Sequence, residues 1–205
     1  MIRFGLTGSI GMGKSAVSAM FERLGVPVFC ADAEVHRLQG PGGALVVAIE
    51  ARFPGSTGPK GVDRTKLGPM VLGKPEELQA LERIIHPAVY RSRKAFLSRH
   101  RSRPLVVLDI PLLLEKMKPL HPVKAADLIA VVSAPIWVQR KRVMRRPGMT
   151  AAKLKQIRRL QVPDHIKRQR ADVVIETGCP EIETYYAVRR LVACIRSRKR
   201  RYSKA

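Results

Sequence analysis

The sequence predicts an α/β protein in which a central parallel sheet is flanked by helices. Short apolar segments with the composition of buried strands alternate along the chain with longer stretches of helical periodicity, which is typical of this class. A glycine-rich loop joins the first predicted strand to the first predicted helix. The length of 205 residues suits one such domain with small insertions.

The glycine-rich loop, Gly8–Ser15, reads Gly-Ser-Ile-Gly-Met-Gly-Lys-Ser. It fits the phosphate-binding pattern of Gly, four free positions and Gly-Lys-Ser. The preceding residues 2–7 are mostly apolar, as in a strand, and residues 16–24 carry apolar side chains three and four positions apart, as in a helix. Strand, loop and helix in this order are the context in which the pattern indicates nucleotide binding.

The residue types of this loop suit a triphosphate tail. Glycines let successive backbone N–H groups face the phosphate oxygens, and the following helix adds its positive N-terminal end. Lys14 is expected to reach the β- and γ-phosphates of ATP, and the Ser15 hydroxyl to ligate Mg²⁺. The alternative is a glycine turn that binds nothing. The predicted ATP-binding residues are Gly8, Gly11, Met12, Gly13, Lys14, Ser15 and Ala16.

The second predicted strand, residues 26–30, is followed closely by Asp32. Ligands of open parallel sheets sit at the carboxyl ends of the strands, so Asp32 is a candidate for the active site. The alternative role for Asp32 is the N-cap of the helix predicted over residues 31–38.

Residues 35–100 predict a helical insertion between the second and third core strands. A helix is expected over residues 44–53, and another starts near Pro75, where proline and acidic side chains mark a first turn. The intervening loop 54–61 is rich in Gly and Pro, and we expect no strand in the insertion. His86-Pro87 is expected to interrupt the last helix, after which a second helical stretch completes the insertion.

Three further strands complete the predicted sheet, over residues 104–109, 127–132 and 171–175. The first of these is continuously apolar, as expected of a strand covered on both faces. It ends in Asp109, where enzymes of this class hold their metal directly or through water; the alternative is an ordinary acid at a strand end. A helix over residues 181–200 closes the chain. The predicted nucleotide-binding core comprises residues 1–34, 101–134 and 165–205.

Residues 135–170 have a helical pattern and carry a single acid, Asp164, among many cations. Pro147-Gly148 divides the segment into two predicted helices. A basic two-helix flap beside a phosphate loop predicts a lid, residues 135–164, whose closure excludes water and brings cations to the transferring group. Solvated surface is the alternative for most of these cations, which are Arg140, Lys141, Arg142, Arg145, Arg146, Lys153, Lys155, Arg158, Arg159, Lys167, Arg168 and Arg170.

The composition limits the class of partner. Lys plus Arg number 39 against 16 Asp plus Glu, a net charge of +23, which favours polyanionic partners such as nucleic acid or a substrate with several phosphates. Solvated surface is the alternative for part of this excess. Three cysteines without metal-ligand spacing favour a reducing cytosol. No apolar run reaches the roughly 20 residues that cross a bilayer and no signal peptide is visible, so we expect a cytoplasmic protein without a membrane partner.

Several motifs in order along nearly the whole chain resemble the dephospho-CoA kinase family. The phosphate loop alone would indicate only a nucleotide-binding protein, whereas its combination with Asp-x-Pro-Leu-Leu-x-Glu and Ile-His-Pro is specific. The matching segments are residues 5–15, Leu24 to Val28 leading to Ala31-Asp32, Ile85-His86-Pro87, Leu108 to Glu115, Met144-Arg145-Arg146, Gln161 and Ala171 to Ile175.

The resemblance implies a P-loop kinase core, a helical CoA-binding insertion and a lid. It implies transfer of the γ-phosphoryl group of ATP to the ribose 3′-hydroxyl of dephospho-CoA, with Mg²⁺, in the final step of coenzyme A synthesis. Asp32 matches the family's catalytic base, a carboxylate able to orient a hydroxyl and accept its proton. Arg142 and Arg146 match lid arginines that neutralise charge in the transition state; Lys14 completes the predicted catalytic set.

Other positions are expected to contact the substrate or to ligate the metal. His86, Pro111 and Leu112 are expected to contact dephospho-CoA, with a buried structural histidine as the alternative for His86. Ser15 and Asp109 are the predicted metal ligands. Glu115 either caps a helix or supports the acceptor site. We expect a monomer or a weak homo-oligomer.

Three residues depart from the family pattern. Cys30 stands where the family usually has a first Asp, in Cys30-Ala31-Asp32. Ala16 replaces a Thr, which leaves Ser15 as the one hydroxyl expected at the metal. Thr177 replaces the usual Asn after the last strand, so no adenine contact is assigned there.

Two other functions compete with this hypothesis. The charge and the basic C-terminal run favour a nucleic-acid-binding protein that uses ATP as a switch, but few aromatic side chains are available for stacking on bases and no binding module is recognisable. A nucleoside monophosphate kinase has the same core and lid, but the segment Asp109 to Glu115 and the acidic turn at Asp32 argue against it.

Overall fold

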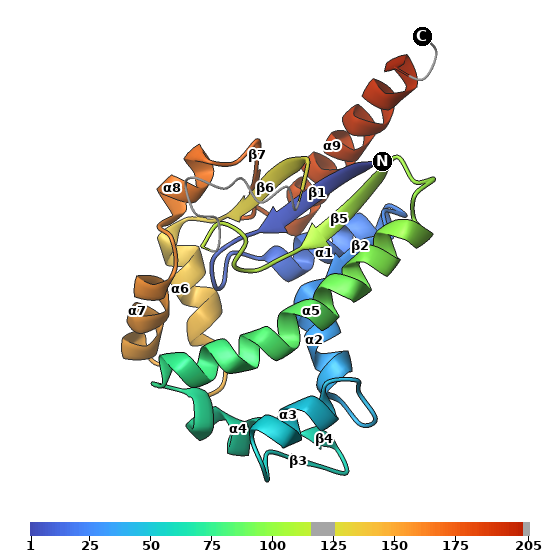
Figure 1. Ribbon diagram of the computed structural model, residues 1–205. Helices are drawn as coiled ribbons and strands as arrows, with labels where there is room; N and C mark the ends of the chain where they lie inside the picture. The colour runs from blue at the N-terminus through green and yellow to red at the C-terminus, as the bar shows by residue number, and fades with distance from the viewer. Residues whose placement is uncertain (116–125, 203–205) are drawn as a thin grey trace. The chain divides into compact units, whose positions relative to one another are not determined.

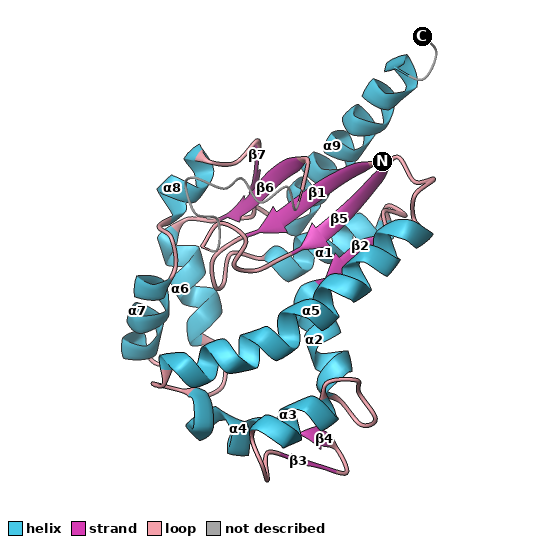
Figure 2. Cartoon of the chain, in the orientation of Figure 1, coloured by secondary structure: helices cyan, strands magenta, loops and turns pink. Residues whose placement is uncertain are grey.

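The computed structural model of the chain describes residues 1–115 and 126–202, with 198–202 described by their backbone alone. Its main feature is a five-stranded sheet with the strand order β2-β5-β1-β6-β7 (Figures 1 and 2). The ladders that join β5, β1, β6 and β7 are parallel, which confirms the predicted fold class. The strands are β1 (Ile2–Thr7), β2 (Val28–Cys30), β5 (Leu105–Asp109), β6 (Leu128–Ser133) and β7 (Val173–Glu176).

The chain divides into two compact units. The first comprises Met1–Phe29 and His100–Ala205, and the second comprises Cys30–Arg99. The phosphate loop and the sheet, apart from Cys30 at the end of β2, belong to the first unit. The second unit is made mainly of helices.

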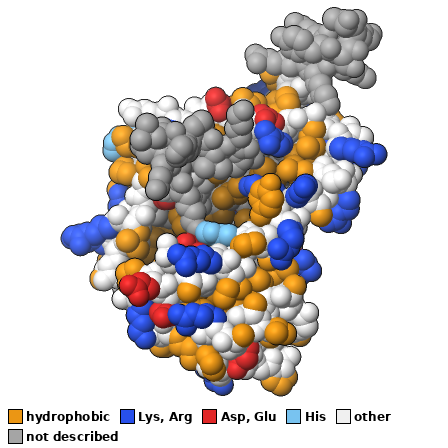
Figure 3. Space-filling model, viewed as in Figure 1, with side chains coloured by type: hydrophobic (Ala, Val, Ile, Leu, Met, Phe, Trp, Pro, Cys, Tyr) orange, Lys and Arg blue, Asp and Glu red, His pale blue; other side chains and the backbone are white. Residues whose placement is uncertain are grey.

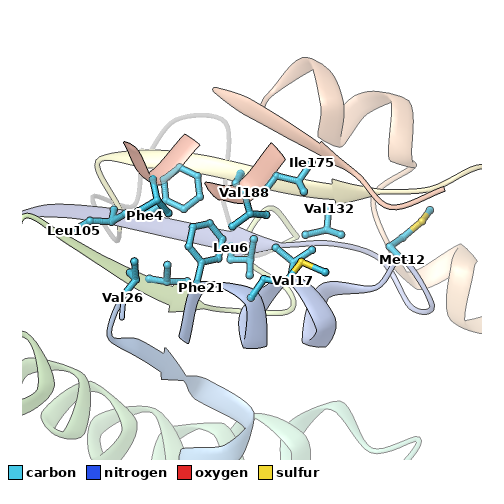
Figure 4. Close-up of a cluster of buried hydrophobic side chains, with 14 of the residues drawn as sticks. Phe4, Leu6, Met12, Val17, Phe21, Val26, Leu105, Val132, Ile175 and Val188 are labelled. Atoms are coloured by element: carbon cyan, nitrogen blue, oxygen red, sulfur yellow. The ribbon is translucent and has the colours of Figure 1, made fainter. Parts of the chain in front are cut away.

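The core of the first unit lies between one face of the sheet and two helices, α1 (Lys14–Arg23) and α9 (Glu181–Tyr202). Phe4 and Leu6 of β1 point from the sheet toward Phe21 of α1 and Val188 of α9 (Figure 4), and all four are fully buried. The ring centroids of Phe4 and Phe21 are 5.7 Å apart. Alternate strand residues and helical residues spaced by three and four therefore meet as their periodicities predict.

Three helices occupy the basic segment where two were expected. They are α6 (Ile136–Met144), α7 (Ala151–Leu160) and α8 (Asp164–Gln169). The turn predicted at Pro147-Gly148 does separate α6 from α7. A second break falls before α8, because Pro163 at its N-cap is extended, with φ −55° and ψ 144°, and the residue before a proline is biased away from helix.

The second unit packs four helices around its own apolar cluster, which includes Leu38, Ile49 and Leu81. The helices are α2 (Ala31–Gln39), α3 (Val46–Arg52), α4 (Arg64–Val71) and α5 (Pro75–Arg99). The expectation of no strand here was wrong, because a short antiparallel hairpin joins β3 (Thr57–Gly58) to β4 (Gly61–Val62). The Glu50 carboxylate stabilises it by accepting hydrogen bonds from the amide and hydroxyl of Thr57.

The predicted interruption at His86-Pro87 was also wrong, because α5 runs through Pro87 without a break. A proline inside a helix removes one backbone hydrogen bond. The flanking apolar side chains Ile84, Ile85, Ala88 and Val89 nevertheless belong to the cluster that α5 forms with α2, α3 and α4. Tertiary packing of this face outweighs the local helix-breaking signal.

Candidate active site

The phosphate loop connects the end of β1 to the start of α1 through a backbone that only glycine tolerates at two points. Gly11 and Gly13 have φ values of 74° and 88°, in the left-handed region that side chains disfavour. A Cβ atom on Gly11 would also lie 2.5 Å from a methyl group of Val143. The spacing of the glycines in the sequence thus matches the conformation that the turn requires.

Helix α1 begins at Lys14, two residues earlier than predicted. Gly13 is its N-cap and has no side chain to offer, so the first-turn amides of Lys14, Ser15 and Ala16 are not capped by it. Ser15 and Ala16 are exposed. Together with the positive end of the helix, these amides form a suitable binding site for phosphate oxygens.

The remaining loop residues are fixed by contacts to β6 and its neighbours. Met12 is buried, and its sulfur accepts a hydrogen bond from the Ala134 amide at 3.2 Å. The Ile10 amide donates to Oε1 of Gln161 at 3.2 Å, and the Ile10 carbonyl accepts from Nε2 of Gln139 at 2.8 Å. Side chains of the basic segment therefore bond both the amide and the carbonyl of Ile10 in the loop.

Lys14 and Asp109, which were predicted as separate parts of the site, form an ion pair. Asp109 ends β5 and pairs in register with Leu6 of β1, just before the phosphate loop. Its side chain is 3% exposed and that of Lys14 is 15% exposed. The Asp109 carboxylate is thus buried against the lysine of the loop.

Arg142 is the predicted lid arginine that the structure brings to the loop. Its guanidinium donates to the hydroxyl of Thr177 at 3.1 Å and to the Thr177 carbonyl at 2.6 Å. Its Nη1 atom is 3.3 Å from the point where a Cβ of Gly13 would stand. Arg146 and Arg140 are exposed, Arg146 in the turn after α6.

Asp32 lies in the first turn of α2, in the second unit, and is exposed. Covalent continuity places it two residues after Cys30, the last residue of β2. The N-cap of α2 is Cys30, whose sulfur accepts from the Ala33 amide at 3.5 Å, so the N-cap alternative for Asp32 is wrong. In the next part of the helix, hydrogen bonds from Arg37 hold the pKa of Glu34 below its usual range.

The three residues predicted to contact the substrate are distributed over both units. His86 is exposed on α5 in the second unit, which contradicts the alternative of a buried structural histidine. Pro111 and Leu112 follow β5 in the first unit. The Pro111 carbonyl accepts from the Thr7 hydroxyl at 2.9 Å, and Leu112 is 40% exposed.

Glu115 joins the segment after β5 to α8. One of its carboxylate oxygens accepts from the Val162 amide at 3.3 Å and lies 2.5 Å from Nζ of Lys167. Lys167 is fully buried. These contacts tie the segment after β5 to the start of α8.

A cavity of about 1180 Å³ is lined by residues of the phosphate loop, of α6, α7 and α8, and of the segments between them. Ser9 and Met12 of the loop line it, together with Gln139 and Gln161. Its cations include Arg168, which is paired with Glu176 at 2.5 Å. The other cations at its wall are Arg140, Lys155, Arg158 and Arg159.

Sequence reasoning missed Gln139, and it gave neither Gln161 nor Thr177 a role in the site. All three are uncharged polar side chains whose partners are distant in sequence, so no local pattern indicates their contacts. An uncharged, buried Gln139 within a run of cations is the one signal that could have been found.

The positive charge is distributed on the face seen in Figure 3. Lys and Arg side chains there are spread among hydrophobic and neutral ones and do not form one continuous band. Within the residues that the structure describes, none of the helices has both the length and the apolar character needed to span a bilayer.

The chain is similar to known proteins over nearly its whole length. A family model described as dephospho-CoA kinase matches residues 2–180. A protein of Novosphingobium aromaticivorans named dephospho-CoA kinase is 57% identical to this chain, over 96% of both chains. A protein of the same name from Zymomonas mobilis is 48% identical to it, over 95% of this chain and 97% of the relative.

Solved structures extend the comparison to the fold. A crystal structure from Thermus thermophilus is 34% identical with a TM-score of 0.80, covering 94% of this chain and 96% of that one. A dephospho-CoA kinase from Campylobacter jejuni covers the same shares at 20% identity, with a TM-score of 0.65, and shares the fold.

Proposed function

The chain belongs to the dephospho-CoA kinase family, and from this premise we propose that it transfers the γ-phosphoryl group of ATP to the ribose 3′-hydroxyl of dephospho-CoA. The products are coenzyme A and ADP, and the reaction is the last step of coenzyme A synthesis. The family match over residues 2–180 carries this proposal. The phosphate loop with its buried Lys14–Asp109 pair supplies the site that such a transfer needs.

The loop binds and orients the nucleotide. Amides at the start of α1 and the ammonium group of Lys14 offer donors to closely spaced phosphate oxygens. Because Asp109 and the buried loop contacts hold these groups in place beforehand, little reorganisation is needed when charge moves in the transition state. Arg142 and Arg146 add cations from the lid segment.

The residues present fit a magnesium ion. Ser15 offers an exposed hydroxyl and Asp109 a carboxylate, and Mg²⁺ prefers oxygen ligands of this kind alongside substrate phosphates. When bound, the ion neutralises charge on the β- and γ-phosphate oxygens. We assign Ser15 and Asp109 to hold it, directly or through water.

Asp32 acts as the general base in this proposal. Its carboxylate orients the ribose hydroxyl and accepts its proton. The second unit, with His86, binds the CoA portion of the acceptor, and Pro111 and Leu112 contact it from the segment after β5. We place the enzyme in the cytoplasm, as a monomer or weak homo-oligomer.

A coupled assay for ADP tests the reaction. We expect turnover that requires both dephospho-CoA and Mg²⁺ and does not respond to DNA or RNA. Turnover with AMP or GMP in place of dephospho-CoA would assign the chain to nucleoside monophosphate kinases. ATP hydrolysis stimulated only by polynucleotide would support the nucleic-acid hypothesis instead.

A further inference from the structure

Three segments that are distant in sequence meet at one buried residue, Thr177. It follows β7 directly and is 5% exposed. Its hydroxyl donates to the Met12 carbonyl of the phosphate loop at 2.6 Å, and its amide donates to the Ser133 carbonyl at the end of β6 at 2.9 Å. Its hydroxyl and carbonyl both accept hydrogen bonds from Arg142 of α6.

The hydroxyl group is what connects the loop to the arginine. A threonine hydroxyl has one proton and two lone pairs. The Thr177 hydroxyl donates its proton to the Met12 carbonyl, whose oxygen is 2.6 Å away, closer than the Ser133 carbonyl oxygen at 3.3 Å. A lone pair of the same hydroxyl accepts a hydrogen bond from Nη1 of Arg142. Without the hydroxyl, the Met12 carbonyl and one guanidinium N–H both lose this partner.

The two bonds from Arg142 fix the plane of its guanidinium. A guanidinium presents its donors as a rigid fork, and both of these donors end on Thr177. The Thr177 hydroxyl is 3.1 Å, and Nη1 of Arg142 is 3.3 Å, from the Cβ position of Gly13. The guanidinium is therefore held beside the turn at which α1 begins.

We propose that Thr177 is a positioning residue for phosphoryl transfer, which acts by holding the phosphate loop at Met12 and the guanidinium of Arg142 beside it. The inference rests on the role given to Arg142 under the proposed function. An arginine that is ordered only in the transition state loses side-chain entropy at that point, whereas one already held there stabilises the developing charge without this cost.

Three variants distinguish a positioning role of Thr177 from a general contribution of its hydroxyl to the stability of the fold. Thr177→Val keeps the shape and removes the hydroxyl, and Thr177→Ser keeps the hydroxyl. Thr184→Val is the matched control, because Thr184 is 2% exposed and its hydroxyl donates to the Glu176 carbonyl at 3.1 Å without touching the loop or Arg142. Melting temperatures and ATP kinetics are measured for each variant.

We expect Thr177→Val to lower kcat and to raise the KM for ATP, with kcat/KM falling about tenfold or more, the value of a lost hydrogen bond. Thr177→Ser should stay within about twofold of the wild type. Thr184→Val should lower the melting temperature and leave both constants unchanged. Equal kinetics for Thr177→Val and the wild type would overturn the inference. If Thr177→Val does not fold, the same comparison is made between the single variants Thr177→Ala and Thr184→Ala.

A double-mutant cycle with Arg142→Ala shows through which group Thr177 acts. We expect the kcat of the double variant to equal that of Arg142→Ala, while the KM for ATP rises with Thr177→Val in both backgrounds through the loss of the Met12 contact. Independent, multiplying effects on kcat would overturn the inference and leave the role of Arg142 intact. Wild-type turnover in Arg142→Ala would instead refute the role that the proposed function gives to Arg142.

Discussion

The ammonium group of Lys14 forms an ion pair with the buried carboxylate of Asp109. The two residues are 95 positions apart in sequence, and the parallel pairing of β1 with β5 brings them together. The pair ties the phosphate loop to the neighbouring strand. A phosphate that reaches Lys14 therefore meets a cation whose position the fold already holds.

Replacing Asp109 with Asn should lower kcat by about 10–100-fold, because it removes a proposed metal ligand and the partner of Lys14. The magnesium concentration needed for half-maximal turnover should rise. A titration of rate against Mg²⁺ measures both effects. The control is Asp172→Asn, since Asp172 accepts from the Ile129 amide near the start of β6, away from the loop. An unchanged magnesium requirement in Asp109→Asn would contradict the metal assignment.

Replacing Asp32 with Asn should leave ATP binding intact and lower kcat by about 10²–10⁴-fold, the usual contribution of a general base. Calorimetry with ATP and the coupled assay separate the two effects. Glu34→Gln is the matched control, because it removes another carboxylate from the same helix. The partner of that carboxylate is Arg37. Near-normal kcat in Asp32→Asn would end the assignment of Asp32 as base.

Acid should destabilise the fold partly through Asp127. Hydrogen bonds from the guanidinium of Arg3 lower the pKa of Asp127 below its ordinary value of 3.8. Because the folded pKa is the lower one, the stabilisation is present above pH 3.8 and is lost as pH falls through the folded pKa. The midpoints of urea unfolding at about pH 6 and about pH 3 measure this loss of stability. Asp127→Asn should reduce the difference between the two midpoints, and an equal difference in both proteins would refute this cause.

The buried pair of Glu115 and Lys167 should show the cost of an unpaired charge. Glu115→Gln leaves the fully buried ammonium of Lys167 without its carboxylate, and breaking a buried pair typically costs about 3–5 kcal/mol. Adding Lys167→Met should restore much of the lost free energy of unfolding, as measured in urea. If the double variant is less stable than Glu115→Gln, a different explanation is needed for the burial of Lys167.

Local patterns predicted the sheet and the loop because their signals are short in range. Apolar runs marked β1, β5, β6 and β7 to within a few residues, and the glycine spacing marked the turn before α1. The same local reasoning failed at Pro87, where packing of α5 overrides a helix-breaking residue. It also missed the hairpin of β3 and β4, whose two-residue strands are too short to show an alternating pattern.

The candidate site divides in the same way. Lys14, Asp109 and Arg142 could be named from motifs, but their contacts could not. The hydroxyl of Thr177 donates to the Met12 carbonyl, 165 positions away, and the side-chain oxygen of Gln161 accepts from the Ile10 amide, 151 positions away. Bonds across such separations depend on the order of the strands, and a single sequence does not reveal that order by its local periodicity.

The sequence by itself determined which reactive groups this protein carries: a phosphate loop, an acid at the end of β5 and cations in the basic segment 135–170. These follow from residue types and from spacings within one turn or strand, where short-range sterics and hydrogen bonding act. Only the tertiary structure decided which of these groups face one another. It paired Lys14 with Asp109 and Arg142 with Thr177 because burial of the sheet between its helices leaves one arrangement in which these polar groups find partners.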